Sequence, residues 1–485
     1  MRLSDLLGAA GFPSENDIEV TGLTADSRTV SSGFLFAALT GTELDGRKYI
    51  DAAINQGAVA ILTDMQYDAS NCTIYCHQVQ EPRLTLAECA ARFEGVQPEI
   101  VTAVTGTNGK TSVAHFVRSI WEKLGYSSAS LGTLGIVVNE KTEDLHYTTP
   151  DPVLLHKLLK QLSTEGVTHT VLEASSHGLD QRRLDAVRVK VAAFTNLTRD
   201  HLDYHSDAKG YLDAKLGLVS RVVEDDGLVV LNADSEVFPE FEKAAHEKNL
   251  RVIEYGRKAS DIQLVSTNSH AGGQHLDILL HGAKYQIDLP LAGEFQAMNI
   301  LCALGIVVGA GANAAAAVAA LETLENVPGR MERVATLPNG AVIYVDYAHT
   351  PDALETVLKA LRPHAFNNVI TVFGCGGDRD QGKRPQMGEI AHKLADAQIV
   401  TDDNPRSEEP SSIRAAILQQ CPNATEIGDR TAAIAASIKM AEAGDVVLIA
   451  GKGHESGQIV GNQIIPFNDK DVILKLTEGG EAAND

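Results

Sequence analysis

A short glycine-containing loop between a buried strand and an amphipathic helix is the feature that most constrains how this chain can fold. Residues Ile100–Val104 are apolar and mostly β-branched on both faces, which is typical of a strand buried in a parallel sheet. The loop Thr105–Ser112 follows at once, and apolar residues then recur at helical spacing over Phe116–Leu124. The segment predicts a strand, a glycine loop and a helix in succession, which indicates an α/β sheet.

Such a loop can hold the phosphates of a nucleotide. Gly106 and Gly109 allow backbone N–H groups to turn toward a phosphate at the positive end of the helix. Lys110 can reach the outer phosphates, and the Thr111 hydroxyl can bind magnesium. Val104 stands where the strict motif has glycine, so the loop is a shortened variant. An ordinary glycine turn is the alternative, but the flanking strand and helix favour ATP or GTP binding. The loop alone names no reaction, because kinases, motors, switches and ligases share it.

The net charge of the chain limits which molecules it is expected to bind. Lys and Arg number 41 against 64 Asp and Glu, which gives a formal net charge of −23. A surface this acidic repels phosphate backbones and anionic lipids, so we expect small-molecule substrates, no nucleic acid and no membrane insertion. The six cysteines contain no C-x-x-C pair, and the N-terminus does not look like a signal peptide, so we expect a cytoplasmic protein. We also expect a monomer. The apolar stretch Ile300–Leu321 contains glycines and predicts a buried helix pair.

The length and the changes of pattern predict three α/β domains. At roughly 150 residues per domain, 485 residues make about three domains. We expect a small N-terminal α/β domain at residues 1–98, a central doubly wound domain with the phosphate loop at 99–328, and a C-terminal Rossmann-like domain at 329–485. Strands of the last two domains are predicted at Thr170–Leu172, Val191–Phe194, Leu228–Leu231, Val342–Val345, Val369–Phe373, Ile399–Val400 and Val446–Ala450.

Metal-capable side chains follow two of these strands. His201 and His205 are four residues apart, but Leu202 and the lack of a nearby cysteine argue against a zinc protease site. Glu173 follows a strand and is expected at the carboxyl edge of the sheet, where doubly wound folds bind ligands. A solvated surface glutamate is the alternative, but the apolar strand before Glu173 argues against it. We therefore predict a magnesium site beside the phosphates.

Six runs of residues, taken together, point to a known family. They are Thr105–Ser112, Glu173–Gly178, Asn196–His205, Asp213–Lys215, Asp346–Asp352 and Asp403–Arg406. In their order the chain resembles the Mur ligases of peptidoglycan synthesis, and the resemblance spans the whole chain. Within that family it is similar to the members that use meso-2,6-diaminopimelate. The resemblance implies an N-terminal domain for the uridine nucleotide, a central ATPase domain and a C-terminal domain for the incoming amino acid.

The resemblance also implies roles for single residues. Lys215 matches a family lysine that carbon dioxide converts to a carbamate, and a carbamate, unlike an ammonium, can hold a cation. An ordinary surface lysine would otherwise be the default. The implied magnesium ligands are Thr111, Glu173, His201 and Lys215 as N6-carboxylysine, and the implied catalytic residues are Lys110, Lys215 and His201. ATP is assigned to Gly106, Thr107, Asn108, Gly109, Lys110, Thr111, Ser112, Asn299, Arg330, Asp346 and His349.

Two further sets of residues are implied for the other substrates. The UDP-muramoyl dipeptide is assigned to Ser27, Thr148, Thr149, Ser175, Gln181 and Arg183, and Thr42–Leu44 lines up with this set but departs from the family residues. Diaminopimelate is assigned to Arg379, Asp403, Asn404, Pro405, Arg406, Gly451 and Glu455, with Glu455 placed for the far ammonium. Because ATP is held from two domains, the resemblance implies that they close before the reaction.

Arg406 is the predicted selector of the amino acid. Diaminopimelate carries a carboxylate that L-lysine lacks, and a guanidinium binds a carboxylate through two parallel hydrogen bonds. An Asn-Pro turn is the alternative explanation of Asp403–Arg406, and the rest of the family pattern argues against it.

The implied reaction is an ATP-dependent ligation through an acyl phosphate. The D-glutamyl γ-carboxylate of UDP-N-acetylmuramoyl-L-alanyl-D-glutamate attacks the γ-phosphate, and the amine of diaminopimelate then attacks the activated carbonyl. His205 or His349 can deprotonate the amine, and the sequence does not choose between them. Folylpolyglutamate synthetases share a related loop and, in some members, the lysine, but the Asp403–Arg406 run and the N-terminal domain argue against them. A nucleotide-driven switch or motor would hydrolyse ATP without an amino acid and would leave Arg406 and Glu455 unexplained.

Overall fold

The computed structural model describes residues 1–8, 17–41, 44–139, 141–145, 147–198, 204–205, 207–270 and 273–478. The chain forms two compact units. Unit 1 comprises Met1–Gln263 and Leu301–Ala317, and unit 2 comprises Leu264–Ile300 and Val318–Asp485.

A four-stranded parallel sheet begins unit 1, with the strands in sequence order. Apolar side chains pack against both faces of this sheet, so it is a small α/β layer structure as the sequence predicts. Its strands are β1 (Gly22–Thr24), β2 (Phe34–Ala37), β3 (Ala60–Asp64) and β4 (Tyr75–Val79), with α1 (Leu3–Leu7), α2 (Ile50–Asn55), α3 (Pro82–Glu94) and the short helices η2 (Ser27–Thr29), η3 (Gly46–Tyr49) and η4 (Ala69–Asn71).

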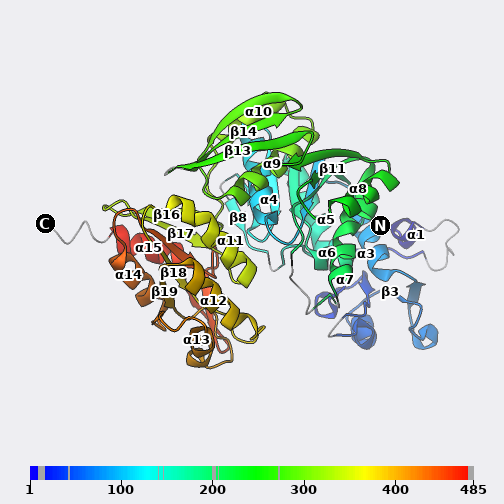
Figure 1. Ribbon diagram of the computed structural model, residues 1–485. Helices are drawn as coiled ribbons and strands as arrows, with labels where there is room; N and C mark the ends of the chain where they lie inside the picture. The colour runs from blue at the N-terminus through cyan, green and yellow to red at the C-terminus, as the bar shows by residue number, and fades with distance from the viewer. Residues whose placement is uncertain are drawn as a thin grey trace. The chain divides into compact units, whose positions relative to one another are not determined.

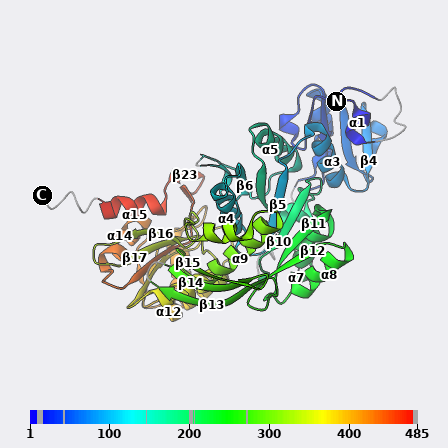
Figure 2. The same ribbon diagram turned by 90° about the horizontal axis from the view of Figure 1, so that it is seen from above.

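The predicted strand before the phosphate loop is β5 (Ile100–Thr105), which lies inside an eleven-stranded sheet between β10 (Val189–Phe194) and β9 (His169–Glu173). All three are parallel, and helices cover them, which confirms the doubly wound arrangement. The sheet order is β15-β14-β13-β12-β11-β10-β5-β9-β6-β7-β8, and Figure 2 shows β10, β11 and β12 side by side. The other strands are β6 (Ser128–Gly132), β7 (Gly135–Val138), β8 (Lys141–Glu143), β11 (Val223–Asn232), β12 (Arg251–Gly256), β13 (Ile262–His270), β14 (Gly273–Leu280) and β15 (Ala283–Leu289).

The helices around the eleven-stranded sheet include the pair that the sequence predicts for the apolar stretch Ile300–Leu321. The apolar stretch forms α9 (Glu294–Gly309) and α10 (Ala314–Leu321), which are separated where glycine and asparagine interrupt it. Ala315, Ala316 and Ala319 of α10 are exposed, so the prediction that both helices are buried is wrong for one face of α10. Within the described residues, every helix is too short or too polar to cross a lipid bilayer. The remaining helices are α4 (Lys110–Lys123), α5 (Pro152–Thr164), α6 (Ser176–Asp180), α7 (Ala208–Gly217), η5 (Leu218–Val222) and α8 (Phe238–Glu247).

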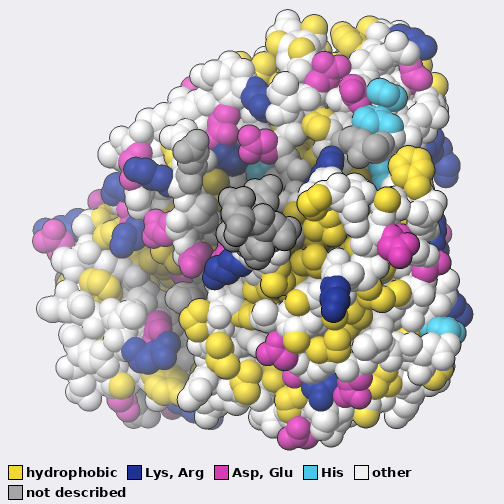
Figure 3. All heavy atoms as spheres, turned by 90° about the vertical axis from the view of Figure 1, so that its left-hand side faces the viewer, with side chains coloured by type: hydrophobic (Ala, Val, Ile, Leu, Met, Phe, Trp, Pro, Cys, Tyr) yellow, Lys and Arg dark blue, Asp and Glu magenta, His cyan; other side chains and the backbone are white. Residues whose placement is uncertain are grey.

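A six-stranded sheet of order β16-β17-β21-β18-β19-β20 lies in unit 2 and is parallel except for β16. One core packs under α11 (Pro351–Leu361), α12 (Lys383–Leu394) and α13 (Pro410–Leu418). A second core packs under α14 (Arg430–Met440) and α15 (Asp469–Glu478), so the predicted Rossmann-like architecture is confirmed. The strands are β16 (Glu332–Thr336), β17 (Val342–Asp346), β18 (Val369–Phe373), β19 (Ala397–Val400), β20 (Thr425–Glu426) and β21 (Val446–Ala450), followed by the hairpin β22 (Gly457–Val460) and β23 (Gln463–Pro466). Figure 3 shows acidic and basic side chains interspersed over one face of the molecule.

Two histidines with a buried ring nitrogen couple the stability of unit 1 to pH. The pKa of His115 on α4 and of His156 on α5 falls to about 4, chiefly because burial disfavours the charged imidazole. The positive charges of Arg118 and Arg188, respectively, contribute to this lowering. In the unfolded chain a histidine has a pKa of about 6.5. Between these two values the unfolded chain binds more protons than the folded chain, so the free energy of unfolding falls as the pH falls.

We expect each of these histidines to account for a loss of up to about 3 kcal/mol between pH 6.5 and pH 4. His156→Gln removes one titrating group, so urea unfolding measured across this range should depend less on pH than in the unsubstituted chain. His246→Gln, at an exposed position on α8, should leave the pH dependence unchanged. Parallel pH profiles for His156→Gln and the unsubstituted chain would contradict the assignment.

Candidate functional site

The phosphate loop lies between β5 and α4, as the sequence predicts. Gly109 has φ 87° and caps the N-terminus of α4, a conformation that favours glycine. At Gly106 an added Cβ would lie 1.9 Å from Thr195 Oγ1, so no side chain fits there. Hydrogen bonds to the segment after β10 fix the loop at Asn108. Thr195 Oγ1 donates to Asn108 O over 2.6 Å, and Asn108 N donates to Asn196 Oδ1 over 2.9 Å.

Two lysines converge on one carbonyl oxygen of this loop. Lys110 Nζ lies 2.9 Å from Gly106 O and also 2.9 Å from Thr107 O. Lys215 on α7 is 1% exposed, and its Nζ donates to the same Gly106 O over 2.7 Å. The Lys215 ammonium also lies 4.4 Å from the centre of the Tyr211 ring. The fold therefore brings a lysine 109 residues away in sequence to the phosphate loop.

Oxygen groups suited to magnesium lie next to the loop. Glu173 ends β9 level with Val104 on β5 and is only 2% exposed. Its Oε2 accepts from Thr111 Oγ1 over 3.0 Å, and its Oε1 accepts from the Thr133 backbone N–H over 2.8 Å. A carboxylate and a hydroxyl in contact are the hard oxygen donors that Mg²⁺ prefers, so the residues present fit this ion. His201, the third implied ligand, lies outside the described residues, as do Thr42 and Glu43.

Five of the six residues assigned to the UDP-muramoyl dipeptide form one hydrogen-bonded network. Thr149 Oγ1 donates to Glu173 O over 2.8 Å and accepts from Ser175 Oγ over 3.0 Å. Arg183 donates to Thr149 O over 2.6 Å and to Gln181 Oε1 over 2.8 Å. Thr148 Oγ1 lies 3.1 Å from Thr133 Oγ1, which itself contacts Glu173. Ser27 is not brought into this network and lies in η2 of the four-stranded region.

A pocket of about 440 Å³ adjoins this network. Its walls come from the four-stranded region and from the segments after α6 and β10. Arg83 donates to Thr40 O over 2.8 Å, and Gln181 donates to Tyr204 OH over 3.1 Å. Arg83 belongs to no motif, and Tyr204 lies within the run Asn196–His205 but received no role there, so sequence reasoning missed both as pocket residues. The lining residues are Thr40, Gly41, Leu44, Arg83, Asp180, Gln181 and Tyr204.

In unit 2 the residues assigned to ATP lie around the end of β17. Asp346 is buried, and its carboxylate accepts from the backbone N–H groups of Met331 over 2.6 Å and Ala348 over 2.7 Å. Burial raises the pKa of Asp346, and the nearby Arg330 works in the opposite direction. The Arg330 guanidinium lies 4.4 Å from the centre of the Tyr347 ring. These contacts hold a carboxylate and a guanidinium at one strand end.

Two more of these residues join the same group. Asn299 donates to Gln296 Oε1 over 3.0 Å, and Gln296 contacts Arg330 O over 3.4 Å. Nδ1 of His349 lies 2.8 Å from Tyr347 O. Burial lowers the pKa of His349, so its imidazole is neutral at pH 7. Unit 2 therefore brings all four of its assigned ATP residues together.

The backbone of Arg406 is held against the β22–β23 hairpin. Its N–H donates to Ile459 O over 3.0 Å, its carbonyl accepts from Gly461 N over 2.7 Å, and its φ of 51° lies in the left-handed region. The side chain is fixed through Nη1, which donates to Gly377 O over 2.9 Å. Among the described residues, hydrogen bonds engage only Nη1 of this guanidinium, which leaves Nη2 and Nε for a carboxylate. Arg379 is exposed on the loop between β18 and α12. The side chains of Arg379 and Arg406 both lie next to Gly376 of that loop.

A fully buried lysine organises the other residues assigned to diaminopimelate. Lys452 Nζ donates to Asn404 Oδ1 over 3.1 Å and to Glu455 Oε2 over 2.8 Å, and it is 0% exposed. Asn404 Nδ2 donates to the same Glu455 oxygen over 2.9 Å. A Cβ on Gly451 would lie 2.6 Å from Asp403 Oδ2, so glycine permits this close packing. Sequence reasoning missed Lys452, although a lysine between two glycines after a strand was an available signal.

A buried ion pair supports the strand that leads to this cluster. Arg430 at the start of α14 donates from Nε and Nη2 to the two oxygens of Asp469 at the start of α15, over 2.7 and 2.8 Å. Both side chains are 0% exposed. Arg430 Nη2 also donates to Ala450 O over 3.0 Å, directly before Gly451. The two residues lie 39 positions apart in the sequence and on different helices, so no local sequence pattern predicts this ion pair.

Comparisons with known proteins match this arrangement over the whole chain. Three family models match, described as "Mur ligase family, catalytic domain" at residues 19–97, "Mur ligase middle domain" at 104–307 and "Mur ligase, glutamate ligase domain" at 329–453. The chain is 51% identical to the UDP-N-acetylmuramoyl-L-alanyl-D-glutamate–2,6-diaminopimelate ligase of Bradyrhizobium diazoefficiens over 98% of both chains. It is 49% identical to the ligase with the same name from Caulobacter vibrioides over 99% of both.

Solved structures agree with these sequence matches. A structure of a UDP-N-acetylmuramoyl-L-alanyl-D-glutamate–2,6-diaminopimelate ligase is 30% identical, covers 99% of both chains and has a TM-score of 0.74. A Mycobacterium tuberculosis folylpolyglutamate synthase is 20% identical, covers 76% of this chain and 92% of its own, and has a TM-score of 0.64. The second likeness is one of fold alone.

We expect Asp469→Asn to destabilise unit 2 by about 3–5 kcal/mol, because it leaves a buried guanidinium without its counter-charge. Glu355→Gln removes one partner of the exposed Lys359 pair on α11 and should cost less than about 1 kcal/mol. Chemical unfolding of the two variants and of the unsubstituted chain, followed by a spectroscopic signal from unit 2, measures how much free energy of unfolding each substitution removes. Equal stabilities would show that the buried pair contributes no more than a surface pair.

Proposed function

The chain belongs to the Mur ligase family, and from this we propose that it joins meso-2,6-diaminopimelate to the D-glutamyl γ-carboxylate of UDP-N-acetylmuramoyl-L-alanyl-D-glutamate, with ATP as the energy source. The full-length identity to diaminopimelate ligases is the observation that carries this function. The reaction belongs to peptidoglycan synthesis, and the family uses ATP and Mg²⁺. The Arg406 and Lys452 clusters in unit 2 support it independently, because they offer a guanidinium and a carboxylate to an amino acid.

The ligation proceeds in two substitution steps. An oxygen of the D-glutamyl γ-carboxylate attacks the γ-phosphorus of ATP, the bond to the β-phosphate oxygen breaks, and ADP leaves. The amine of diaminopimelate then attacks the carbonyl carbon of the acyl phosphate, and inorganic phosphate leaves as the amide forms. Activation is needed because a carboxylate at neutral pH is a poor acceptor for an amine.

The residues of the phosphate loop bind and orient the triphosphate. Lys110 places a positive charge where the transferring phosphoryl group gathers negative charge. Thr111 and Glu173 would hold Mg²⁺, which supplies further charge neutralisation there. The Thr149–Arg183 network and the adjoining pocket support an assignment of that region to the UDP-muramoyl dipeptide. We propose that residues 1–98 form the UDP-muramoyl-peptide-binding domain, 99–328 the central ATPase domain and 329–485 the amino-acid-binding domain. Single side chains of the central and C-terminal domains also contact the dipeptide and the nucleotide, respectively.

In unit 2 we assign the two ends of diaminopimelate to different side chains. Nη2 and Nε of Arg406 bind the distal carboxylate through parallel hydrogen bonds. Glu455, held by Lys452 and Asn404, accepts from the distal ammonium. Asn299, Arg330, Asp346 and His349 bind the nucleotide from this unit. A neutral His349 imidazole can take the proton that the attacking amine loses.

We assign a carbamate to Lys215. The neutral amine adds to the carbon of carbon dioxide, a C–N bond forms, one proton is released, and the side chain ends in a carboxylate. The support is electrostatic, because Lys110 and Lys215 otherwise place two ammonium groups against one carbonyl oxygen. A carbamate turns this repulsion into attraction and adds an oxygen donor for a cation.

We place this reaction in the cytoplasm and expect the protein to be a monomer. None of the six cysteines is paired in a disulfide, which agrees with a reducing compartment.

The amino-acid dependence of phosphate release tests the function. With ATP, Mg²⁺ and the UDP-muramoyl dipeptide, we expect release with meso-diaminopimelate, and neither with L-lysine nor without an amino acid. Release with lysine would keep the ligase but reject the role of Arg406, whereas release without any amino acid would reject the ligase.

A substitution at Arg406 tests the selector. Arg406→Asn keeps a residue that tolerates a positive φ, and it should raise the KM for diaminopimelate by about 100-fold, the loss of two charge-assisted hydrogen bonds. Arg333→Asn, at an exposed position on β16, is the matched control and should change neither KM nor kcat. An unchanged preference for diaminopimelate over lysine in Arg406→Asn would assign the selection elsewhere.

Lys215→Ala tests the carbamate. We expect activity to fall by more than about 100-fold, since the phosphoryl group loses part of its charge stabilisation, and added bicarbonate should not restore it. Lys209→Ala changes an exposed lysine of the same helix and should keep full activity. Activity of the unsubstituted chain should fall when carbon dioxide is stripped from the buffer and return with bicarbonate. Full activity in Lys215→Ala would overturn the assignment.

A further inference from the structure

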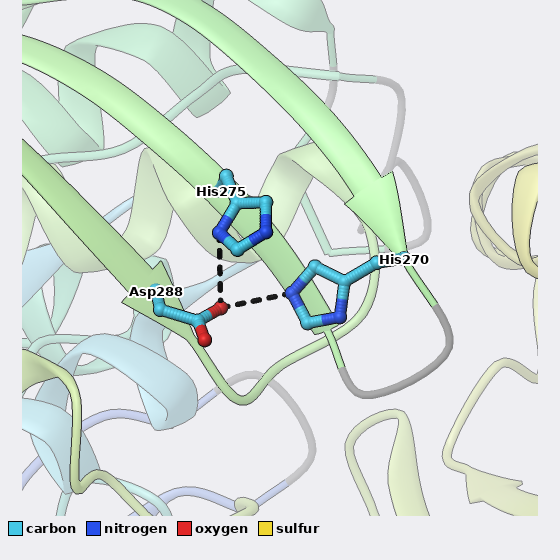
Figure 4. A group of neighbouring side chains, drawn as sticks. All are labelled: His270, His275 and Asp288. Atoms are coloured by element: carbon cyan, nitrogen blue, oxygen red, sulfur yellow. Dashed lines mark hydrogen bonds and ion pairs between the residues drawn. The ribbon is translucent and has the colours of Figure 1, made fainter.

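Three metal-capable side chains meet on the outer face of three neighbouring strands in unit 2. His270 ends β13, His275 lies on β14 and Asp288 lies on β15 (Figure 4). His275 and Asp288 are directly paired across the antiparallel β14–β15 ladder. Their sequence neighbours Leu276 and Ile287 point into the core, so alternation along each strand turns His275 and Asp288 outward. None of these three residues belongs to the ligase site described above.

Both imidazoles approach the same carboxylate oxygen. His270 Nε2 lies 2.9 Å from Asp288 Oδ1, and His275 Nδ1 lies 3.2 Å from that oxygen. The two ring centres are 4.4 Å apart, and the three ligand atoms all lie within 4.8 Å of one another. Figure 4 shows both rings directed at Asp288. Ligand atoms about 2 Å from a tetrahedral zinc ion lie roughly 3.3 Å from one another, close to the two shorter separations.

We propose that His270, His275 and Asp288 form a binding site for Zn²⁺ that is separate from the ligase site. Two imidazole nitrogens and one carboxylate are ligands that suit zinc, whereas Mg²⁺ prefers oxygen donors alone. Three protein ligands leave a fourth position for water. A bound ion cross-links β13, β14 and β15 at one level of the sheet and thereby stabilises unit 2.

The surroundings of the cluster support a cation. The Asp288 backbone N–H lies 3.5 Å from Glu322 Oε1, so a second carboxylate adds negative potential beside the cluster. The main chain of His270 is fixed by η6 (Arg362–His364), because Nδ1 of His364 lies 3.1 Å from His270 O. Ligands on paired strands are held by the sheet, which lowers the cost of assembling them around an ion. The His275 side chain is 62% exposed, so its ring can rotate toward an ion.

The competing explanation is a cluster that binds no metal, in which hydrogen bonds from the two imidazoles to Asp288 only tie the strands together. That cluster would stabilise the hairpin without added zinc, and its loss would not change zinc binding. Zinc titration of matched variants therefore separates the two explanations.

The experiment uses the full-length protein without a polyhistidine tag, freed of metal with a chelator and kept reduced. Zn²⁺ is titrated against a competing chromophoric chelator in millimolar Mg²⁺, which occupies oxygen-donor sites. Because thiols and the phosphate-loop region can also bind zinc, the readout is the change in the number of sites. We expect His275→Ala and Asp288→Asn each to remove one site, or to weaken it by at least about tenfold, since even outer-shell changes weaken metal sites by that factor.

His281→Asn is the matched control, because it removes a histidine from the β14–β15 turn with a residue that tolerates its φ of 48°. It should keep the full number of sites. Zinc should also raise the unfolding midpoint of the unsubstituted protein and of His281→Asn, but not that of the two cluster variants. Ligase activity without zinc should be equal in all four proteins, so this test does not depend on the proposed reaction.

Equal zinc stoichiometry and affinity in His275→Ala, Asp288→Asn and the unsubstituted protein would overturn the proposal. Displacement of the cluster's zinc by millimolar Mg²⁺ would overturn it as well.

Discussion

The convergence of Lys110 and Lys215 on the carbonyl oxygen of Gly106 is the interaction around which unit 1 is arranged. It requires β5 to end beside Thr195 so closely that only glycine fits, and it requires α7 to bury a lysine. Buried charges are costly unless they are compensated. The two ammonium groups lie where the phosphates of a bound nucleotide are expected, and the Thr111–Glu173 contact beside them supplies oxygen donors for a cation.

Unit 2 also buries charged side chains. There Lys452 and Arg430 are fully buried and are paired with Glu455 and Asp469 respectively. Removing one partner of a buried ion pair destabilises a protein by more free energy than forming the pair contributes. These contacts therefore fix one arrangement of the loops after β21 and add little net stability to the folded unit. The side chains assigned to diaminopimelate are therefore positioned before any ligand arrives. Preorganised polar groups of this kind favour selective binding, because little free energy is spent on ordering them.

The strands β13, β14 and β15 extend the large sheet beyond its parallel part, and they carry a cluster of a different chemical character. The parallel part places oxygen-rich and cationic groups at strand ends, where ligands of doubly wound folds bind. The antiparallel strands instead place His270, His275 and Asp288 side by side on an outer face, because directly opposed residues of neighbouring strands share one face. One sheet therefore carries two kinds of side-chain cluster, one at the ends of its parallel strands and one on the face of its antiparallel strands.

The sequence by itself determined the strand, loop and helix around Gly106, the position of Glu173 after β9, the helix pair α9 and α10 and most strands of the C-terminal sheet. These depend on periodicity and on residues close together in the chain. Only the tertiary structure brought Lys215 to Gly106, Arg430 to Asp469, Lys452 to Glu455 and Asn404, and His270 to Asp288. Except for Lys452 and its near neighbour Glu455, such partners are separated by 18 to 109 residues, so their contact depends on the order and register of whole elements. That order is set by the packing of whole elements around a shared core, which no local pattern encodes.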